Sequence, residues 1–392
     1  MIINNKRTQG KWSRSIAVSF LSILLLMATA GCMSDSDSET IIIPENGQPA
    51  SGASLGEAFQ VKTIYPLPAS ASSEMQVLGW TSGESAVGYF IANHVSADAL
   101  PNGLQLLAPP YEQPKRLVNT SILSKSILGL SPDGKQIAAL DVSANSISLT
   151  LMTVEDGQIK HFAVPAVKKR TLLSRIIQWS NNSRYISFLA AGDSREQLNI
   201  VIHDVVDGTS QTLPLRGYSN TEGGLSAILS NDGSHVLMND GKLVAMAKRN
   251  ADGGFEVQYD HPAVTGGSTW VDDDRFIFLG KDGTLFQYDH RNGELSVLME
   301  KVSSFSLSPD RKVIAYTRND MDAIYVGQRQ GNNVLYETAV YQGIVPYEMM
   351  WSLSNRALLI DGSKPYSRTA QELAPAPAAD QEGLRAFIIT FQ

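Results

Sequence analysis

One short pattern recurs seven times along this chain and constrains its fold more than any other feature. In each copy a hydrophobic run ends in Trp or Leu, a polar turn rich in Ser, Asp, Asn and Gly follows, and a second hydrophobic run begins. The residues that end the first run, called anchors below, are Trp80, Leu130, Trp179, Leu229, Trp270, Leu307 and Trp351. Successive anchors are 50, 49, 50, 41, 37 and 44 residues apart. A period of this length is typical of repeat architectures.

The residues of each repeat indicate antiparallel strands. Pro132 presets φ at the start of a turn, while Asp133 supplies a local acceptor and Gly134 a permissive backbone. The runs that follow the turns are rich in β-branched and aromatic residues, which suit buried strands. A second strand and turn come next, so each repeat predicts a meander of four short strands. We therefore predict an all-β chain folded as a β-propeller, with seven blades favoured and six as the alternative.

The two ends of the repeat region predict how the ring closes. The terminal strand, residues 384–391, serves best as the third strand of the last blade, which then lacks an outer strand. Residues 61–67 precede the first anchor and can supply it. Pairing them would hide two exposed strand edges. The Ala- and Pro-rich residues 362–383 are expected to form a surface insertion in that blade.

The turn sequences also carry a family resemblance. The pattern is clearest at residues 131–134, 230–233 and 308–310, and it resembles the TolB-like and WD-repeat propeller families, the TolB-like family more closely. The resemblance covers residues 61–392 and implies the propeller architecture. It also implies protein partners in the cell envelope, although such repeats occur in proteins with unrelated tasks.

The start of the chain has the features of a secretory signal. Its first residues carry four cationic and no acidic side chains, and residues 16–27 form an apolar run that is short for a membrane span. The only cysteine of the chain, Cys32, follows Ala30 and Gly31. This arrangement resembles the lipobox of bacterial lipoproteins, in which the cysteine becomes the acylated first residue. The alternative is an ordinary cleaved signal with an incidental cysteine.

We accordingly expect three segments: a lipoprotein signal peptide over residues 1–31, a flexible tether over residues 32–60 and the propeller over residues 61–392. The tether is polar and rich in small residues. A lipidated Cys32 predicts attachment to a bacterial cell membrane on its extracytoplasmic side. The sequence does not distinguish the inner from the outer membrane.

The charge of the chain argues against a nucleic-acid partner. The net charge of −7 includes four cations of the predicted signal, so its removal leaves −7 − 4 = −11. An acidic surface repels phosphate backbones. We therefore expect no nucleic acid among the partners, and an envelope protein or peptide instead.

The sequence contains no motif for catalysis or for a cofactor. It has no P-loop and no glycine-rich dinucleotide fingerprint after a strand. The six histidines do not share a metal-ligand spacing; they are His94, His161, His203, His235, His261 and His290. We expect no cofactor and predict a binding or scaffolding module. The alternatives are an enzyme or its regulatory domain, whose site would converge from several blades, and an envelope signalling sensor.

One set of acidic residues could form a site without a linear motif. Connections between the second and third strands of the blades lie on one face of a propeller, and nearly every one is expected to carry an aspartate: Asp141, Asp193, Asp240, Asp282, Asp320 and Asp361. Such a ring could hold Ca²⁺ or attract a cationic peptide. Turn chemistry is the competing interpretation, because three of these residues precede glycine in the pair that tight hairpins favour.

Overall fold

The computed structural model describes residues 59–67, 76–90, 103–117, 127–142, 147–164, 173, 177–192, 197–218, 226–318, 322–363 and 384–392. Every described residue belongs to one compact unit, residues 54–392. Its regular elements are all strands, which confirms the predicted all-β class. The described residues contain no helix long and apolar enough to cross a membrane.

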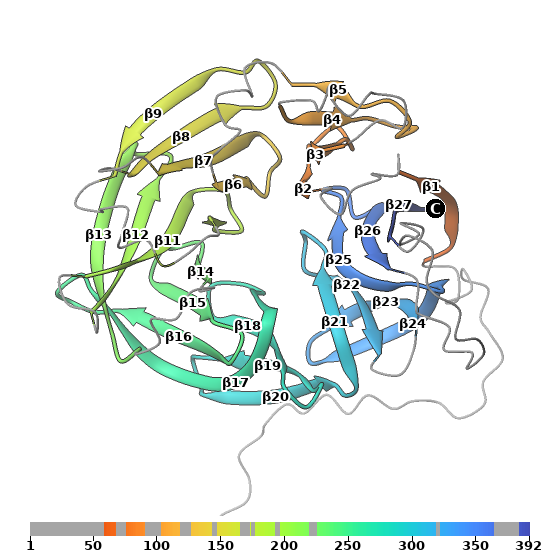
Figure 1. The fold of residues 1–392 in the computed structure, drawn as a ribbon. Coiled ribbons are helices and arrows are strands. Elements are labelled where there is room, and N and C mark those ends of the chain that lie inside the picture. Colours follow the sequence, from red (N-terminus) through yellow and green to blue (C-terminus); the bar gives the residue numbers. More distant parts are fainter. Residues whose placement is uncertain are drawn as a thin grey trace, which may run out of the picture. The chain divides into compact units, whose positions relative to one another are not determined.

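The strand pairings group the described strands into sets of four, which we call blades and number in chain order. Each blade is an antiparallel meander, and the first strands of blades 1, 2, 4, 6 and 7 lie near the centre of the ring (Figure 1). Blades 1 to 3 contain β2 (Gln76–Trp80), β3 (Ala86–Tyr89), β4 (Gln105–Leu107), β5 (Lys115–Arg116), β6 (Ile127–Leu130), β7 (Gln136–Val142), β8 (Ile147–Thr153), β9 (Ile159–Ala163), β10 (Gln178–Trp179), β11 (Tyr185–Ala191), β12 (Leu198–Asp204) and β13 (Thr209–Arg216).

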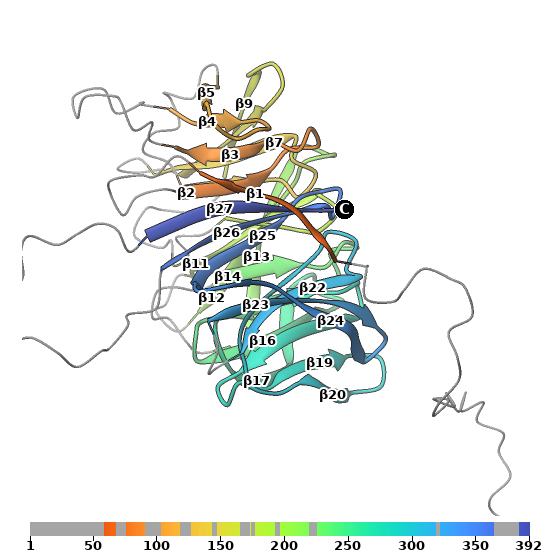
Figure 2. The same ribbon diagram turned by 90° about the vertical axis from the view of Figure 1, so that its right-hand side faces the viewer.

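The second half of the ring is built in the same way. Blades 4 to 7 contain β14 (Ser226–Leu229), β15 (His235–Asn239), β16 (Leu243–Arg249), β17 (Phe255–Trp270), β18 (Arg275–Gly280), β19 (Leu285–Asp289), β20 (Glu294–Met299), β21 (Val302–Leu307), β22 (Val313–Arg318), β23 (Ala323–Gln330), β24 (Asn333–Gln342), β25 (Val345–Trp351), β26 (Ala357–Ser363), β27 (Leu384–Phe391) and β1 (Val61–Pro66). Figure 2 shows the strands of the unit from the side.

All seven predicted anchors occupy the same position. Each is the last residue of the first strand of its blade, and the polar turn after it leads into the second strand. We call the side of the ring that carries these turns the anchor face. Because the strands alternate in direction, the connections between second and third strands lie on the opposite face.

The ring closes as the sequence predicts. β1 pairs antiparallel with β27, from Val61 opposite Phe391 to Pro66 opposite Phe387. The N-terminal strand is therefore the outer strand of blade 7, and the last blade contains both ends of the repeat region (Figure 1). The predicted insertion begins later than expected, because β26 continues to pair with β27 through Ser363. The rest of it, residues 364–383, lies outside the described residues.

β17 departs from the simple repeat. It runs for 16 residues and is both the outer strand of blade 4 and the inner strand of blade 5. Its first residues also pair in parallel with the end of β13, Leu215 opposite Phe255. Blades 3, 4 and 5 thereby form one sheet of 11 strands. The sequence analysis did not predict this continuity, since the repeats were expected to be separate meanders.

The hydrophobic core of the described residues lies between blades rather than at the centre of the ring. Seven clusters of buried side chains each join two neighbouring blades, including blade 7 with blade 1. The four anchor tryptophans reinforce these joints. Their indole nitrogens donate to the inner strand of the preceding blade; for example, Trp270 Nε1 lies 2.8 Å from the Ile228 carbonyl oxygen and Trp80 Nε1 lies 3.0 Å from that of Met350. Burying an indole with its donor satisfied stabilises each joint.

Candidate functional site

The turns of the anchor face in blades 2, 3, 4, 6 and 7 share one hydrogen-bond pattern. In blade 2, Ser131 Oγ donates to Asp133 Oδ1 at 2.6 Å and accepts the backbone N–H of Gln136 at 2.9 Å. Blade 6 repeats it, with Ser308 Oγ 2.6 Å from Asp310 Oδ1. The serines are buried, so the pattern supplies partners for backbone groups that would otherwise be unpaired. It fixes the turns as a rigid rim.

Further hydrogen bonds join this rim from blade to blade. The backbone N–H of Asp133 donates to Ser183 Oγ in blade 3 at 3.0 Å, and that of Asn182 donates to Asn231 Oδ1 in blade 4 at 2.8 Å. The backbone N–H of Asn231 donates in turn to Asp273 Oδ1 in blade 5 at 2.6 Å. The anchor face between blades 2 and 5 is therefore held by side chains that bind the neighbouring turn.

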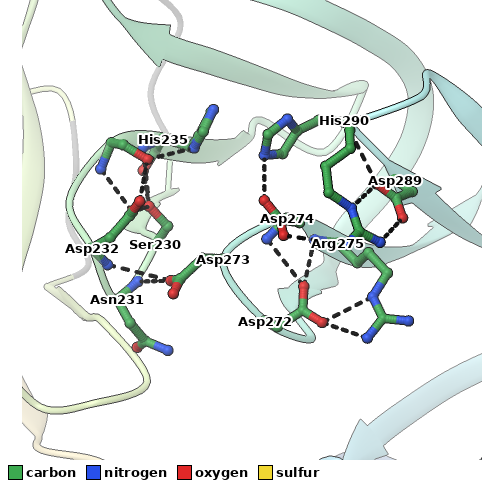
Figure 3. A network of polar contacts seen from close by, with 12 residues as sticks. Ser230, Asn231, Asp232, His235, Asp272, Asp273, Asp274, Arg275, Asp289 and His290 are labelled. Atoms are coloured by element: carbon green, nitrogen blue, oxygen red, sulfur yellow. Dashed lines mark hydrogen bonds and ion pairs between the residues drawn. The ribbon is translucent and has the colours of Figure 1, made fainter.

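Figure 3 shows where this rim meets a pair of histidines between blades 4 and 5. The rings of His235 and His290 lie 4.1 Å apart, and His290 Nε2 is 3.2 Å from Asp274 Oδ1. His235 is only 5% exposed. Burial, then the neighbouring His290, lowers the pKa of His235 to about 4, so its ring is neutral near pH 7. This neutral ring packs between His290 and Trp270.

A cavity of about 410 Å³ opens inside the rim of the anchor face. Its walls come from blades 1, 2, 3, 6 and 7 and are largely apolar, with Trp80, Trp351 and Leu353 among them. Polar groups from the turns complete it, including Asp133 and Arg311. A cavity of this size, with apolar walls and few polar groups, is the usual form of a ligand site.

Arg311 is the cationic residue among those that line this cavity. Burial and then the nearby Arg329 lower its pKa to about 10, whereas Asp310 raises it. Within the described part of the chain its side chain has no ion pair and no hydrogen bond. The cavity therefore combines apolar walls with a cation that lacks a counter-charge. This combination has the form of a binding cavity.

The predicted aspartates lie mainly at the opposite face. Asp240 and Asp282 occupy connections between second and third strands, as expected. Asp240 Oδ1 accepts the backbone N–H of Leu243 at 2.7 Å, and Asp282 Oδ1 accepts that of Thr284 at 3.0 Å. The hydrogen bonds from Thr284 hold the pKa of Asp282 below its usual range. These two carboxylates thus form the turns, and cation binding by them stays a prediction.

The other four aspartates do not complete a described ring. Asp141 and Asp361 were expected in connections, and this is wrong, because β7 and β26 continue to pair beyond them. Asp193 and Asp320 lie outside the described residues. No group of three or more metal-ligating side chains occurs in the part of the chain that the structure describes.

Two further features bear on the site. Cys32, the predicted lipidation residue, lies outside the described residues. The sequence analysis missed Arg311, although a signal was present: blade 2 reads Ser-Pro-Asp-Gly where blade 6 reads Ser-Pro-Asp-Arg. A cation that replaces glycine in an otherwise identical turn could have been singled out.

Comparisons with known proteins agree with the fold. No protein-family model matches the chain, and no curated protein matches it significantly in sequence. Among solved structures, the chain is similar to one in a crystal structure of the mitotic checkpoint complex, with 13% identity over 92% of this chain and 99% of that chain and a TM-score of 0.54. Similar too are the C-terminal WD40 domain of Sif2 (14%, 82% of each chain, 0.45) and Kluyveromyces lactis Hsv2 (14%, 61% of this chain and 71% of that chain, 0.44).

Identities this low show the fold alone. The structure and the likeness to the chain of the checkpoint complex define the class of the protein by its fold, an all-β propeller. This confirms the predicted fold class. The envelope setting that the TolB-like resemblance implies belongs to the proposal below.

Proposed function

We propose that this protein is a non-catalytic binding scaffold, anchored by lipid to the outside of a bacterial cell membrane, which receives a protein partner at the anchor-face cavity. The observation that carries the proposal is the cavity itself, about 410 Å³ with walls from five blades. Rigid walls favour binding because little freedom is lost when a partner docks. The propeller architecture is consistent with this role, since WD40 propellers suggest protein-binding scaffolds.

The anchor is supported by the sequence alone. The single Cys32 after Ala30 and Gly31 fits acylation at the start of a mature chain. One acyl chain binds a membrane only marginally, whereas two give stable attachment. We expect Cys32→Ser to move the protein from the membrane fraction to the soluble fraction and to abolish labelling by a palmitate analogue. Unchanged labelling and fractionation would remove the anchor from the proposal.

A photo-crosslinking experiment tests the binding site. A photoreactive amino acid at Leu353, in the cavity wall, should give discrete adducts with a partner in the producing cells. The same amino acid at Val206 is the control, because Val206 is 74% exposed and lies in the turn between β12 and β13, outside the cavity lining. Equal adducts at both positions, or none at Leu353, would contradict binding at the cavity.

A further inference from the structure

Arg311 occupies a turn position of positive φ that recurs in the blades. Its φ is 63°, in the left-handed region that disfavours residues with a Cβ. The same turn position carries Gly134 in blade 2 and Gly233 in blade 4, with φ of 69° and 72°. Blades 1, 3 and 7 carry Glu84, Ser183 and Asn355 there, with φ of 58°, 60° and 62°. The backbone conformation thus belongs to the repeat, and Arg311 differs from its equivalents by its cationic side chain in the cavity lining.

Arg311 forms no ion pair with the charged residues around it in the described part of the chain. Arg329 lies beside it and donates from Nε to the Arg311 carbonyl oxygen at 2.9 Å. Arg329 Nη1 also donates to neutral groups, Gln287 Oε1 at 3.1 Å and the Gly331 carbonyl oxygen at 3.3 Å. Asp310 is close, but its Oδ1 already accepts from Ser308 and Lys312 within the turn. Two guanidinium groups thus lack a paired carboxylate among the described residues.

A ligand carboxylate would supply the missing charge. Guanidinium and carboxylate are both planar and can form two parallel hydrogen bonds. Asp133 also lines the cavity, and its negative charge disfavours a doubly charged phosphate. The remaining walls include apolar residues from blades 1, 6 and 7, among them Trp80, Trp351 and Leu353, and neutral polar residues of the turns. The matching ligand is a single carboxylate flanked by apolar groups.

We propose that Arg311 binds a carboxylate of the partner, carried on a peptide segment with apolar flanking residues. This inference rests on the proposed function, because it names the chemistry of the partner at the same cavity. The carboxylate has two sources, an acidic side chain or the C-terminus of a chain. Both present the same group to the guanidinium.

Three tripeptide probes and the purified full chain test the inference. Acetyl-Leu-Asp-Leu-amide carries a side-chain carboxylate, acetyl-Leu-Leu-Leu carries only the terminal one, and acetyl-Leu-Asn-Leu-amide is neutral. Binding is followed by tryptophan fluorescence, since Trp80 and Trp351 line the cavity, and by calorimetry. We expect at least one acidic peptide to bind tenfold or more tightly than the neutral one, as expected for a hydrogen bond to a charged group.

Two variants assign the effect to a residue. Arg311→Gln should remove the preference for the acidic peptide, while Lys312→Gln, which deletes the exposed neighbouring cation, should change affinity less than twofold. Arg311→Gly provides a second variant that suits the backbone, should Arg311→Gln fold poorly. Equal binding of acidic and neutral peptides, no binding of either acidic peptide, or a preference that survives both Arg311 variants would overturn the inference. Crosslinking at Leu353 would still report separately on the proposed function.

Discussion

The first turns of blades 2 and 6 have the same geometry but differ in one residue. In both, a buried serine hydroxyl lies 2.6 Å from the aspartate Oδ1 two residues later. The residue after the aspartate has a φ of 69° in blade 2 and 63° in blade 6. That residue is Gly134 in the first turn and Arg311 in the second. The backbone chemistry is therefore fixed, while the side chain at the left-handed position is not.

The surroundings explain the difference. A Cβ on Gly134 would lie 2.4 Å from the Trp80 carbonyl oxygen and 2.5 Å from the Thr81 Cα. Blade 1 packs so closely against this turn that only glycine fits at position 134. The equivalent position in blade 6 has space for a full guanidinium side chain. A position that is structural in one blade can hence carry a binding group in another.

The largest expected effect is that of Gly134→Ala. Its new Cβ meets backbone atoms that cannot move aside cheaply, and it also imposes strain at positive φ. We expect a loss of more than about 3 kcal/mol in the free energy of unfolding, measured by urea denaturation.

Gly253→Ala separates the two causes. Gly253 has a φ of 88°, yet nothing lies within 4 Å of a Cβ built there. This control should lose only about 1 kcal/mol, the cost of the backbone conformation. Similar losses for the two variants would show that packing against blade 1 does not decide the residue at position 134.

These turns also show how far the sequence predicts the molecule. Serine, aspartate and glycine at fixed spacing indicate the local hydrogen bonds of the turns, and the anchors before these turns were predicted correctly. The closing pair of strands was also predicted correctly. The long β17 was not, because pairing of β13 with β17 depends on tertiary packing. The cavity was missed for the same reason, since its residues come from five blades. Asp141 and Asp361 were misplaced because strand ends depend on the partner strand.

The turn of blade 4 differs from those of blades 2 and 6, because the buried His235 follows it. The pKa of His235 is about 4 in the fold against 6.5 for the ordinary side chain, so the unfolded chain binds the proton first as pH falls. His235 therefore makes stability fall between about pH 6.5 and pH 4. From pH 7 to pH 5 we expect this group alone to remove about 2 kcal/mol.

Denaturation of the wild type and His235→Gln at both pH values measures this contribution. The variant should lose about 2 kcal/mol less than the wild type between pH 7 and pH 5. His161→Gln is the control, since it removes a histidine from the exposed outer strand β9 and leaves the blade 4 turn unchanged. If His235→Gln retains the full wild-type dependence, the histidine pair between blades 4 and 5 does not set it.

Serine substitutions test whether the two turns are equivalent. Ser131 and Ser308 are 3% and 0% exposed, and each hydroxyl accepts a backbone N–H at 2.9 Å, from Gln136 and Val313 respectively. Alanine leaves these donors without a partner, which costs roughly 1–2 kcal/mol. We expect Ser131→Ala and Ser308→Ala to lower the free energy of unfolding by nearly equal amounts. A clear inequality would mean that the shared geometry does not reflect a shared energy.

Arg311→Gly makes the blade 6 turn like that of blade 2 and has the smallest expected effect on stability. Glycine relieves the strain at a φ of 63° and removes a desolvated charge, but it also raises the entropy of the unfolded chain. These contributions leave a net gain of roughly 0–1 kcal/mol in the free energy of unfolding. The change in the free energy of unfolding is thus opposite in sign to that of Gly134→Ala. Urea denaturation of the two variants side by side measures it. A loss above about 1 kcal/mol in the free energy of unfolding would contradict this expectation. It would show that the aliphatic part of the Arg311 side chain stabilises the turn by packing. A stable variant that no longer prefers the acidic peptide would place the function of this position in its guanidinium group.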